Sequence, residues 1–321
     1  EDTMQFAKLY ATASYSTTES LKEAERFHFN IEYRSVNGYL RYWHNDADFY
    51  DLFGPTERSR KGDAVLAGYK WPLIYDPPIQ MNFAADLAYF TGLDTLPGNQ
   101  NVPASADEIS SLDFKLDYTD TDKSLGAVDH EKGYRWEIAW GTDFADRAFF
   151  PKARVGFDFG FPIGWEHSSL WLYSSAGLSG GDRLNPLTPF YFGGFKNNYL
   201  DDKETKRYRE YHTLPGFEID EVAARSFAKT VAEWNLPPIR FEDVGTPSLY
   251  LGSIRSALFA GLLQADPGLE SERTLGNAGA QFDFNFTLAH RLPMTFSVGY
   301  AAGIEDWTKQ DEEWLISLKI L

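Results

Sequence analysis

Cysteine is absent from the 321 residues of this chain, and basic residues are few beside acidic ones, at 30 against 47. The lack of cysteine excludes disulfides, thiolate metal sites and a cysteine nucleophile, so redox chemistry does not indicate the compartment. The net charge of −17 argues against a duplex nucleic-acid partner, because binding to phosphates needs a basic surface. We therefore expect no nucleic acid among the partners.

Long hydrophobic runs are also missing. No stretch approaches the roughly 18 apolar residues that a membrane-spanning helix needs, and the mean hydropathy is −0.40. This excludes a helical membrane protein but permits a membrane-spanning barrel, whose strands alternate and have ordinary average hydropathy. The chain starts at Glu1 without a signal peptide, which indicates a mature or excised product.

Aromatic residues are abundant, at 16% of the chain, and they alternate with polar residues. Successive side chains of a strand point to opposite faces, so this alternation predicts strands with one apolar face. For example, Val155, Phe157 and Phe159 alternate with Arg154 and Asp158. We count about fourteen such strands, and helical periodicity is nearly absent.

A soluble sandwich would alternate in the same way, so the lengths of the connections decide between the two architectures. When the connections are numbered along the chain, the odd ones are mostly long and polar. They include Ser16 to Glu25, Asn45 to Gly62, Phe90 to Asp107, Gly180 to Arg225, Asp266 to Thr274 and Ile304 to Glu313. A short helical segment is expected near 20–25, within the first of them. The even ones are mostly short, apart from Asp120 to Lys132, and include Val36 to Gly38, Pro77 to Pro78, Ile163 to Glu166, Asn235 to Pro247 and Arg291 to Pro293.

Long loops at one end and short turns at the other are typical of a barrel inserted from the periplasm. The sequence therefore predicts a single domain over residues 1–321. We expect an all-β fold, a closed antiparallel transmembrane β-barrel of about 14–16 strands in the bacterial outer membrane, with lipid as its partner. A soluble all-β binding protein is the less favoured alternative.

The chain from Pro189 to Phe259 resembles the barrel region of large bacterial surface proteins that carry TolB-like β-propeller repeats upstream. That branch is related to the BamA/TamA (surface antigen) superfamily. The same resemblance extends to Phe49 to Gly62, Gly92 to Val102, Ser124 to Trp136 and Gly276 to Pro293. It implies a sixteen-stranded barrel, a periplasmic propeller or partner protein, and a role as a membrane anchor, translocation or assembly module.

In the superfamily, a long extracellular loop folds into the lumen and carries an Arg-Gly-Phe/Tyr motif at its tip. The corresponding tip here reads LPGF at 214–217, with Pro215 in place of the arginine. The lumenal aspartate that usually pairs with this arginine is also replaced, because the next strand reads FAG at 259–261. Losing both is physically coherent, since a desolvated charge without its partner costs several kcal/mol. The departure argues against an insertase-like function.

The connection from Gly180 to Arg225 is too long and aromatic for a simple linker, so we expect it to fold inward and plug the lumen; a solvated surface loop is the alternative. Basic residues of the loop, Lys203, Lys206, Arg207 and Arg209, are expected to pair with acidic residues of the lumen wall, Asp113, Asp117, Asp158 and Asp283. The predicted site further includes Gly193, Gly194, Pro215, Gly216 and Phe217 in the loop, and Arg255 on the wall as a partner of Glu218 or Asp220.

No catalytic, cofactor or metal site is predicted. None of the six histidines falls in a close pair with metal-ligand spacing. His167 precedes Ser168 and Ser169, but catalysis needs a base within hydrogen-bond reach, and no Gly-x-Ser-x-Gly motif occurs. Acidic residues on the polar face would favour cations in an open channel, whereas the basic residues there favour charge balance in a closed lumen. A passive solute pore is therefore the alternative to the anchoring and transport or assembly module.

Overall fold

A computed structural model of the chain describes residues 7–17, 22–46, 60–95, 106–195, 200–201, 205–242, 244–246, 248–306 and 308–320. Its framework is fourteen long strands. They are β1 (Ala7–Tyr15), β2 (Phe27–Ser35), β3 (Gly38–Asp46), β4 (Arg60–Asp76), β5 (Ile79–Thr95), β6 (Ile109–Asp122), β7 (Lys132–Ala145), β8 (Ala148–Pro162), β9 (Ser169–Ser179), β13 (Ser226–Asn235), β16 (Leu249–Ala265), β17 (Arg273–Leu288), β18 (Leu292–Glu305) and β19 (Thr308–Ile320).

Each long strand pairs antiparallel with the next long strand along the chain, so the strand order follows the sequence from β1 to β19. The remaining elements are short: β10 (Phe190–Phe192), β11 (Leu200–Asp201), β12 (Val222–Ala224), β14 (Ile239–Arg240), β15 (Gly245–Thr246) and the 3-10 turns η1 (Glu23–Glu25) and η2 (Arg207–Arg209). The helical segment expected near 20–25 is therefore a single 3-10 turn in its described part.

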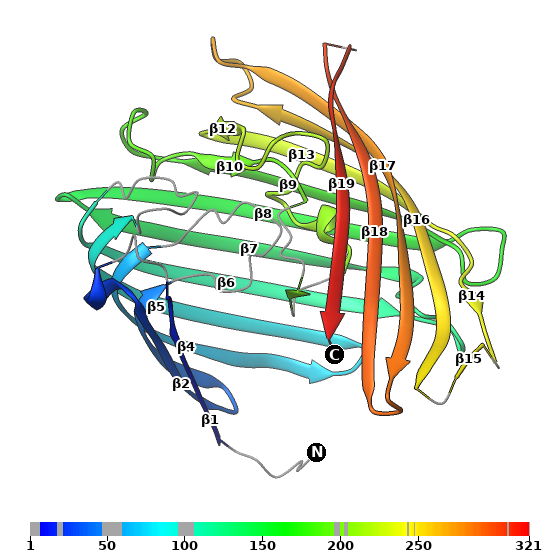
Figure 1. The fold of residues 1–321 in the computed structure, drawn as a ribbon. Helices are drawn as coiled ribbons and strands as arrows, with labels where there is room; N and C mark the ends of the chain where they lie inside the picture. The colour runs from blue at the N-terminus through cyan, green and yellow to red at the C-terminus, as the bar shows by residue number, and fades with distance from the viewer. Residues whose placement is uncertain are drawn as a thin grey trace.

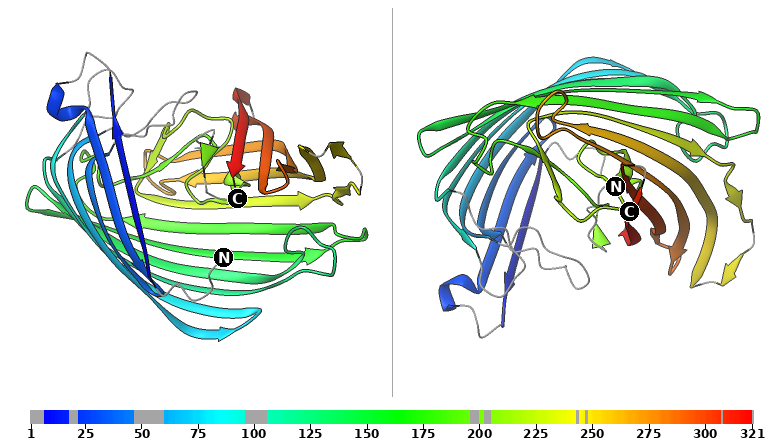
Figure 2. Two further views of the ribbon diagram at one scale, coloured as in Figure 1. Left: turned by 60° about the horizontal axis from the view of Figure 1, so that its bottom comes forward. Right: turned by 90° about the horizontal axis from the view of Figure 1, so that it is seen from above.

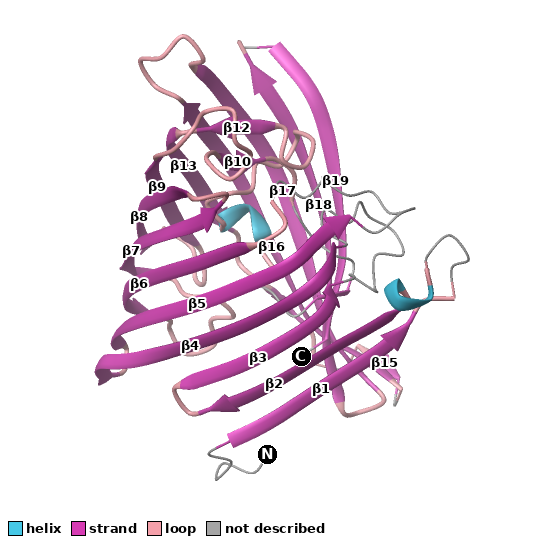
Figure 3. Ribbon diagram, turned by 90° about the vertical axis from the view of Figure 1, so that its left-hand side faces the viewer, coloured by secondary structure: helices cyan, strands magenta, loops and turns pink. Residues whose placement is uncertain are grey.

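The long strands form one strongly curved sheet (Figure 1). Seen from above, the sheet arches around an interior (Figure 2). The chain that connects β9 to β13 lies on this concave side, where Figure 3 shows β10, β12 and η2. In the part of the chain that the structure describes, no helix is long and apolar enough to cross a membrane.

The alternation of side chains places apolar residues on the convex face and polar residues on the concave face. On β8, Phe157 is 50% exposed, while its neighbour Asp158 is half-buried and bonded to Arg135. On β17, Phe282 is 47% exposed, whereas Asp283 is fully buried. An apolar row that is exposed rather than sandwiched between two sheets agrees with the prediction from the sequence and excludes a two-layer sandwich for these strands.

Most of the connections also follow the predicted asymmetry. At one end of the sheet they span 16–26, 47–59, 96–108, 146–147, 180–225, 266–272 and 306–307, and at the other end 36–37, 77–78, 123–131, 163–168, 236–248 and 289–291. The long connection predicted from Ile304 to Glu313 is wrong, because β18 and β19 continue their pairing to Glu305 and Thr308. The turn at 146–147 is also short, although it lies at the long-loop end.

The two outer strands of the sheet are β1 and β19. Within the described residues, β1 pairs only with β2, and β19 pairs with β18 and, in parallel, with the two residues of β11. No pairing of β1 with β19 occurs in the same residues. The observed architecture is thus an all-β, barrel-like sheet of fourteen long strands, and its closure remains a prediction.

Candidate functional site

The segment 180–225, called the inner loop below, occupies the boundaries that the sequence predicted, because β9 ends at Ser179 and β13 starts at Ser226. It has secondary structure of its own. Strands β10 and β12 pair antiparallel, and Gly194 forms an isolated bridge with Leu214. The inner loop is therefore a folded unit rather than a linker.

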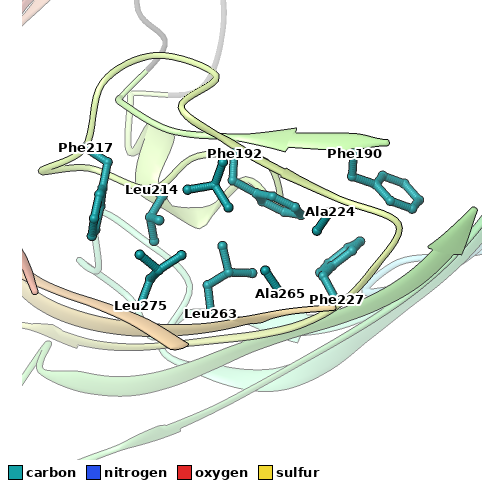
Figure 4. Packing of buried hydrophobic residues seen from close by; sticks show 10 residues of the cluster. Phe190, Phe192, Leu214, Phe217, Ala224, Phe227, Leu263, Ala265 and Leu275 are labelled. Atoms are coloured by element: carbon teal, nitrogen blue, oxygen red, sulfur yellow. The ribbon is translucent and has the colours of Figure 1, made fainter. Parts of the chain in front are cut away.

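A hydrophobic cluster attaches the inner loop to the concave face of the sheet. Figure 4 shows Phe190, Phe192 and Leu214 of the loop packed over Phe227 of β13 and Leu263 of β16. The ring of Phe227 contacts the rings of Phe192 and Phe190 edge-on, at centroid distances of 4.8 and 5.0 Å. Burial of each such side chain contributes about 1.5–3 kcal/mol, so the cluster is a major source of the docking energy.

The tip of the loop, with the predicted residues Pro215, Gly216 and Phe217, lies against the last strands of the sheet. The Asn277 side chain of β17 donates a hydrogen bond to the Pro215 carbonyl at 3.0 Å. Gly216 has a φ of +92°, and a Cβ placed on it would lie 2.3 Å from the backbone nitrogen of Gly303 on β18. Only glycine fits this position, because the backbone is left-handed and the neighbouring backbone is too close for a side chain.

Glu313 on β19 holds the same tip by a carboxylate that accepts backbone hydrogen bonds. The N–H of Phe195 donates to both of its oxygens at 3.0 and 3.1 Å, and the N–H of Gly216 donates to Oε2 at 3.1 Å. Charge-assisted hydrogen bonds of this kind are about twice as strong as neutral ones. Sequence reasoning missed Glu313, because the pattern placed it at the end of a connection, whereas it lies within β19 opposite Ala301.

We predict that Glu313→Ala loosens the loop tip, because two backbone N–H groups lose their acceptor at a cost of about 1–3 kcal/mol each. Limited proteolysis should then cleave the inner loop several times faster than in the unmodified protein. Glu312→Ala is the matched control, since Glu312 is exposed and bonds to Lys309 and Tyr300. Equal cleavage rates for the two variants would contradict the role assigned to Glu313.

A buried group of charges fixes the middle of the inner loop. Arg209 donates from Nε to Glu233 Oε2 at 2.7 Å and from Nη2 to Glu233 Oε1 at 2.6 Å, and Nη2 also donates to Asp129 at 2.8 Å. Lys206 lies 3.3 Å from Asp129 and 3.4 Å from Glu233, and it donates to Asn235. These residues, Asp129, Lys206, Arg209, Glu233 and Asn235, are called the charge cluster below.

The charge cluster joins three parts of the chain: the connection between β6 and β7, the inner loop, and β13. Glu233 is completely buried, so its charge depends on the two cations beside it. Burial alone would raise the pKa of Asp129, but the neighbouring Arg209 and Lys206 cations hold that pKa well below its usual range. Asp129 thus stays ionised, and the cluster balances two carboxylates against two cations.

The partners predicted for the basic residues of the loop are therefore corrected. The predicted wall residues Asp113, Asp117, Asp158 and Asp283 are not the ones that Lys206 and Arg209 contact. Arg207 pairs with Glu210 of its own loop at 3.3 Å, and Lys203 lies outside the described residues. The position of η2 explains this. It lies over β13 and beside residue 129, so Lys206 and Arg209 reach Glu233 and Asp129 before they reach the predicted wall residues.

The predicted wall residues find other partners on the concave face. Asp158 accepts a hydrogen bond from Arg135 at 2.6 Å. Asp283 accepts from Gln281 and Ser297, both at 2.7 Å. The carboxylate nearest to Arg255 is that of Asp283, at 3.9 Å, so the expected pairing of Arg255 with Glu218 or Asp220 is wrong. The inter-strand register explains this, because Arg255 lies directly opposite Asp283 on the next strand.

The inner loop does not fill the whole interior. Two neighbouring cavities of about 540 and 690 Å³ remain between the loop and a wall that consists mainly of β5 to β9. Lys115, Arg154 and Tyr211 line both cavities, and the guanidinium of Arg154 lies over the Tyr211 ring at 4.0 Å. The predicted residues Asp113 and Asp158 line one cavity each. The inner loop therefore occupies the concave side along β13 to β19 and leaves more space along β5 to β9.

A serine, a histidine and a glutamate meet at the short-turn end but do not form a catalytic triad. His167 Nδ1 lies 3.2 Å from the Ser124 hydroxyl and 2.9 Å from Glu131 Oε1. In a triad, the serine and the carboxylate bond to opposite ring nitrogens, so that one can be deprotonated while the other orients the base. Here both contacts use Nδ1. Ser168 donates to the carbonyl of Asn235 instead of approaching the histidine.

No family model matches the chain, and no curated protein matches its sequence. Among solved structures, BamA from Haemophilus ducreyi lacking POTRA domains 1–3 is similar to it, with a TM-score of 0.52 at 11% identity over 98% of this chain and 70% of that chain. Wzi, an outer-membrane carbohydrate-binding β-barrel involved in group 1 capsule assembly in Escherichia coli, matches over 95% of this chain and 76% of its own at 12% identity, but its TM-score of 0.30 carries no argument. The chain therefore has an all-β, barrel-like fold similar to that of the BamA structure.

Proposed function

We propose that this chain is a bacterial outer-membrane β-barrel with a lumen that its inner loop keeps occluded, and that it anchors a larger transport or assembly system in the membrane. The observation that carries the proposal is the attachment of the inner loop at three separate places on the concave face. These are the hydrophobic cluster, the charge cluster and the tip on β18 and β19.

The membrane location is supported by the convex face. Aromatic rings run across neighbouring strands there, from Phe83 on β5 through Phe114 on β6 to Trp140 on β7, with centroid distances of 6.0 and 5.7 Å. Trp140 is 42% exposed and Ile138 51% exposed. An exposed apolar surface of this extent is unfavourable in water but suits hydrocarbon and its interfaces.

A bilayer also requires every backbone polar group to be paired, because no water is present to replace a missing partner. The outer edges of β1 and β19 therefore have to pair along their length within the membrane, and we propose that they close the barrel by pairing with each other. The even number of long strands makes this pairing antiparallel, like the other pairings between long strands.

A passive solute pore is the second candidate, because cavities of about 540 and 690 Å³ remain along β5 to β9. Their lining mixes Asp113 and Asp158 with Lys115, Arg135 and Arg154, and ion pairs such as Arg135–Asp158 neutralise part of it. Balanced charge gives no strong ion selectivity. An occluded anchor and a weakly selective pore therefore differ mainly in conductance.

Two measurements test the proposal. Reconstituted into planar bilayers, the protein should show long closed periods and only brief openings; a steady large conductance would support the pore and refute the occluded lumen. In solution, the protein should need detergent to remain monodisperse. A monodisperse protein without detergent would refute the lipid-facing surface, and with it both candidates.

A periplasmic propeller or another partner protein is proposed on the resemblance of the sequence alone. Parts of the segments that carry the resemblance, residues 49–59 and 96–102, lie outside the described residues. Copurification of a periplasmic partner with the tagged full-length protein would test it.

A further inference from the structure

The outer edge of β19 has an occupant in the structure. Residues Leu200 and Asp201 of the inner loop, which form β11, pair in parallel with Leu318 and Lys319. The opposite edge of β19 is already taken at the same two residues, since Leu318 pairs with Phe296 and Lys319 with Thr295 of β18. At these two residues, the inner loop therefore covers the edge of β19 that faces away from the sheet.

The same edge is the one that β1 needs in a closed barrel. The pairing of residues can be followed from strand to strand around the sheet, starting at Lys8 of β1. On β19 it leads to a position about three residues before Thr308, the first residue of that strand. Because the strands of a barrel are tilted, the pairing shifts along the strands by a fixed number of residues in one turn around the barrel. This shift, called the stagger below, follows from the tilt. For fourteen strands tilted by about 35–45°, with the usual spacings along and between strands, it amounts to about 14 to 20 residues.

Only even staggers keep the lumenal side chains on the lumenal face. A stagger of about 14 places Lys8 directly opposite Lys319, and like charges opposite each other are unfavourable. A stagger of about 16 instead places Tyr10 opposite Lys319, Thr12 opposite Ser317, and, on the convex face, Tyr15 opposite Trp314. Larger staggers leave few paired residues at the end of β19. The stagger of about 16 therefore avoids placing Lys8 opposite Lys319 and still pairs most of β1 with β19.

We infer that β1 and β11 bind the same edge of β19 and exclude each other. β1 pairs with β19 at Tyr10–Lys319 and Thr12–Ser317 in the closed barrel, and β11 covers the edge at Leu318 and Lys319 when β1 is away. An exposed edge strand pairs readily with any other strand, so a substitute from the same chain protects it. This inference rests on the proposed membrane barrel, since only a bilayer demands that the edge be paired.

Cysteine pairs test the inference, because the chain has no cysteine of its own. The Thr12→Cys/Ser317→Cys pair should cross-link about tenfold faster in outer membranes than Thr12→Cys/Leu315→Cys, since the diagonal distance of about 7–8 Å is too long for a disulfide. The Asp201→Cys/Lys319→Cys pair reports β11 on the edge. It should cross-link slowly in the intact protein and faster when Leu9→Pro removes an N–H of β1 from the pairing.

A variant with all four cysteines, Thr12→Cys, Ser317→Cys, Asp201→Cys and Lys319→Cys, gives the decisive result. We expect each molecule to carry one disulfide or the other, as read from peptides after digestion. Both disulfides in one molecule, a faster Thr12–Leu315 pair, or no Asp201–Lys319 product under any condition would each overturn the inference. Detergent dependence is measured on the same samples, so failure of the exchange is distinguished from failure of the membrane barrel.

Discussion

Replacing Glu233 with alanine is expected to destabilise the folded protein by about 3–5 kcal/mol, because two buried cations lose their main counter-charge. Arg209 loses two hydrogen bonds, of 2.7 and 2.6 Å, and Lys206 loses a carboxylate at 3.4 Å. Asp129 alone cannot balance both cations. Urea unfolding in detergent, followed by tryptophan fluorescence, measures the loss, and heat-dependent gel mobility offers an independent check.

Two further variants separate the loss of charge balance from the loss of side-chain volume. Arg209→Met combined with Glu233→Met removes one charge of each sign and keeps the bulk, so it should cost much less than Glu233→Ala alone. Glu312→Ala, on the exposed face, should change stability by less than about 0.5 kcal/mol. A Glu233→Ala protein as stable as the Glu312→Ala protein would show that the charge cluster does not hold the loop.

The second large effect is expected for Gly216→Ala. A methyl group at this position would lie 2.3 Å from the backbone nitrogen of Gly303, and the residue has a φ of +92°. The loop tip then has to leave β18, which also breaks the hydrogen bond from Gly216 to Glu313. We expect a loss of about 3 kcal/mol, of which about 1 comes from the left-handed backbone, and more frequent openings in planar bilayers.

Gly268→Ala is the matched control for this substitution. Its φ is +77°, so it carries the same backbone strain, but nothing lies within 4 Å of the added methyl group. It should therefore cost about 1 kcal/mol and leave the conductance unchanged. Equal effects of the two substitutions on conductance would contradict the docking of the loop tip on β18.

Much of this fold is predictable from the sequence, because apolar residues recur at every second position along a strand that has one apolar face. The rows around Phe157 and Phe282 show this repeat, and the long polar segment 180–225 contrasts with it, so both the strands and the inner loop can be located. The connection between β18 and β19 was predicted too long, because the polar residues around it belong to the ends of these two strands and not to a loop. Polarity alone does not separate a loop from a strand that extends beyond the apolar belt.

The partners within the charge cluster are not predictable in the same way. Glu233 lies in β13, where the outward residues Thr230 and Ala232 are small and weakly apolar, so the alternation there is indistinct. Asp129 lies in a connection, and only the folded path of the chain brings it beside Arg209. Residue type predicted that Lys206 and Arg209 would pair with acids; the choice of acid depends on strand register and on where the loop folds.

The central claim is that the convex face touches lipid and the concave face surrounds the inner loop. Nitroxide labels on Phe157→Cys and Asp158→Cys, neighbours on β8, test it in reconstituted vesicles. We predict that the label at 157 collides mainly with oxygen dissolved in the bilayer, and the label at 158 mainly with a water-soluble nickel complex or with neither. A label at 157 that is as accessible to the nickel complex as one on an exposed loop would contradict the claim.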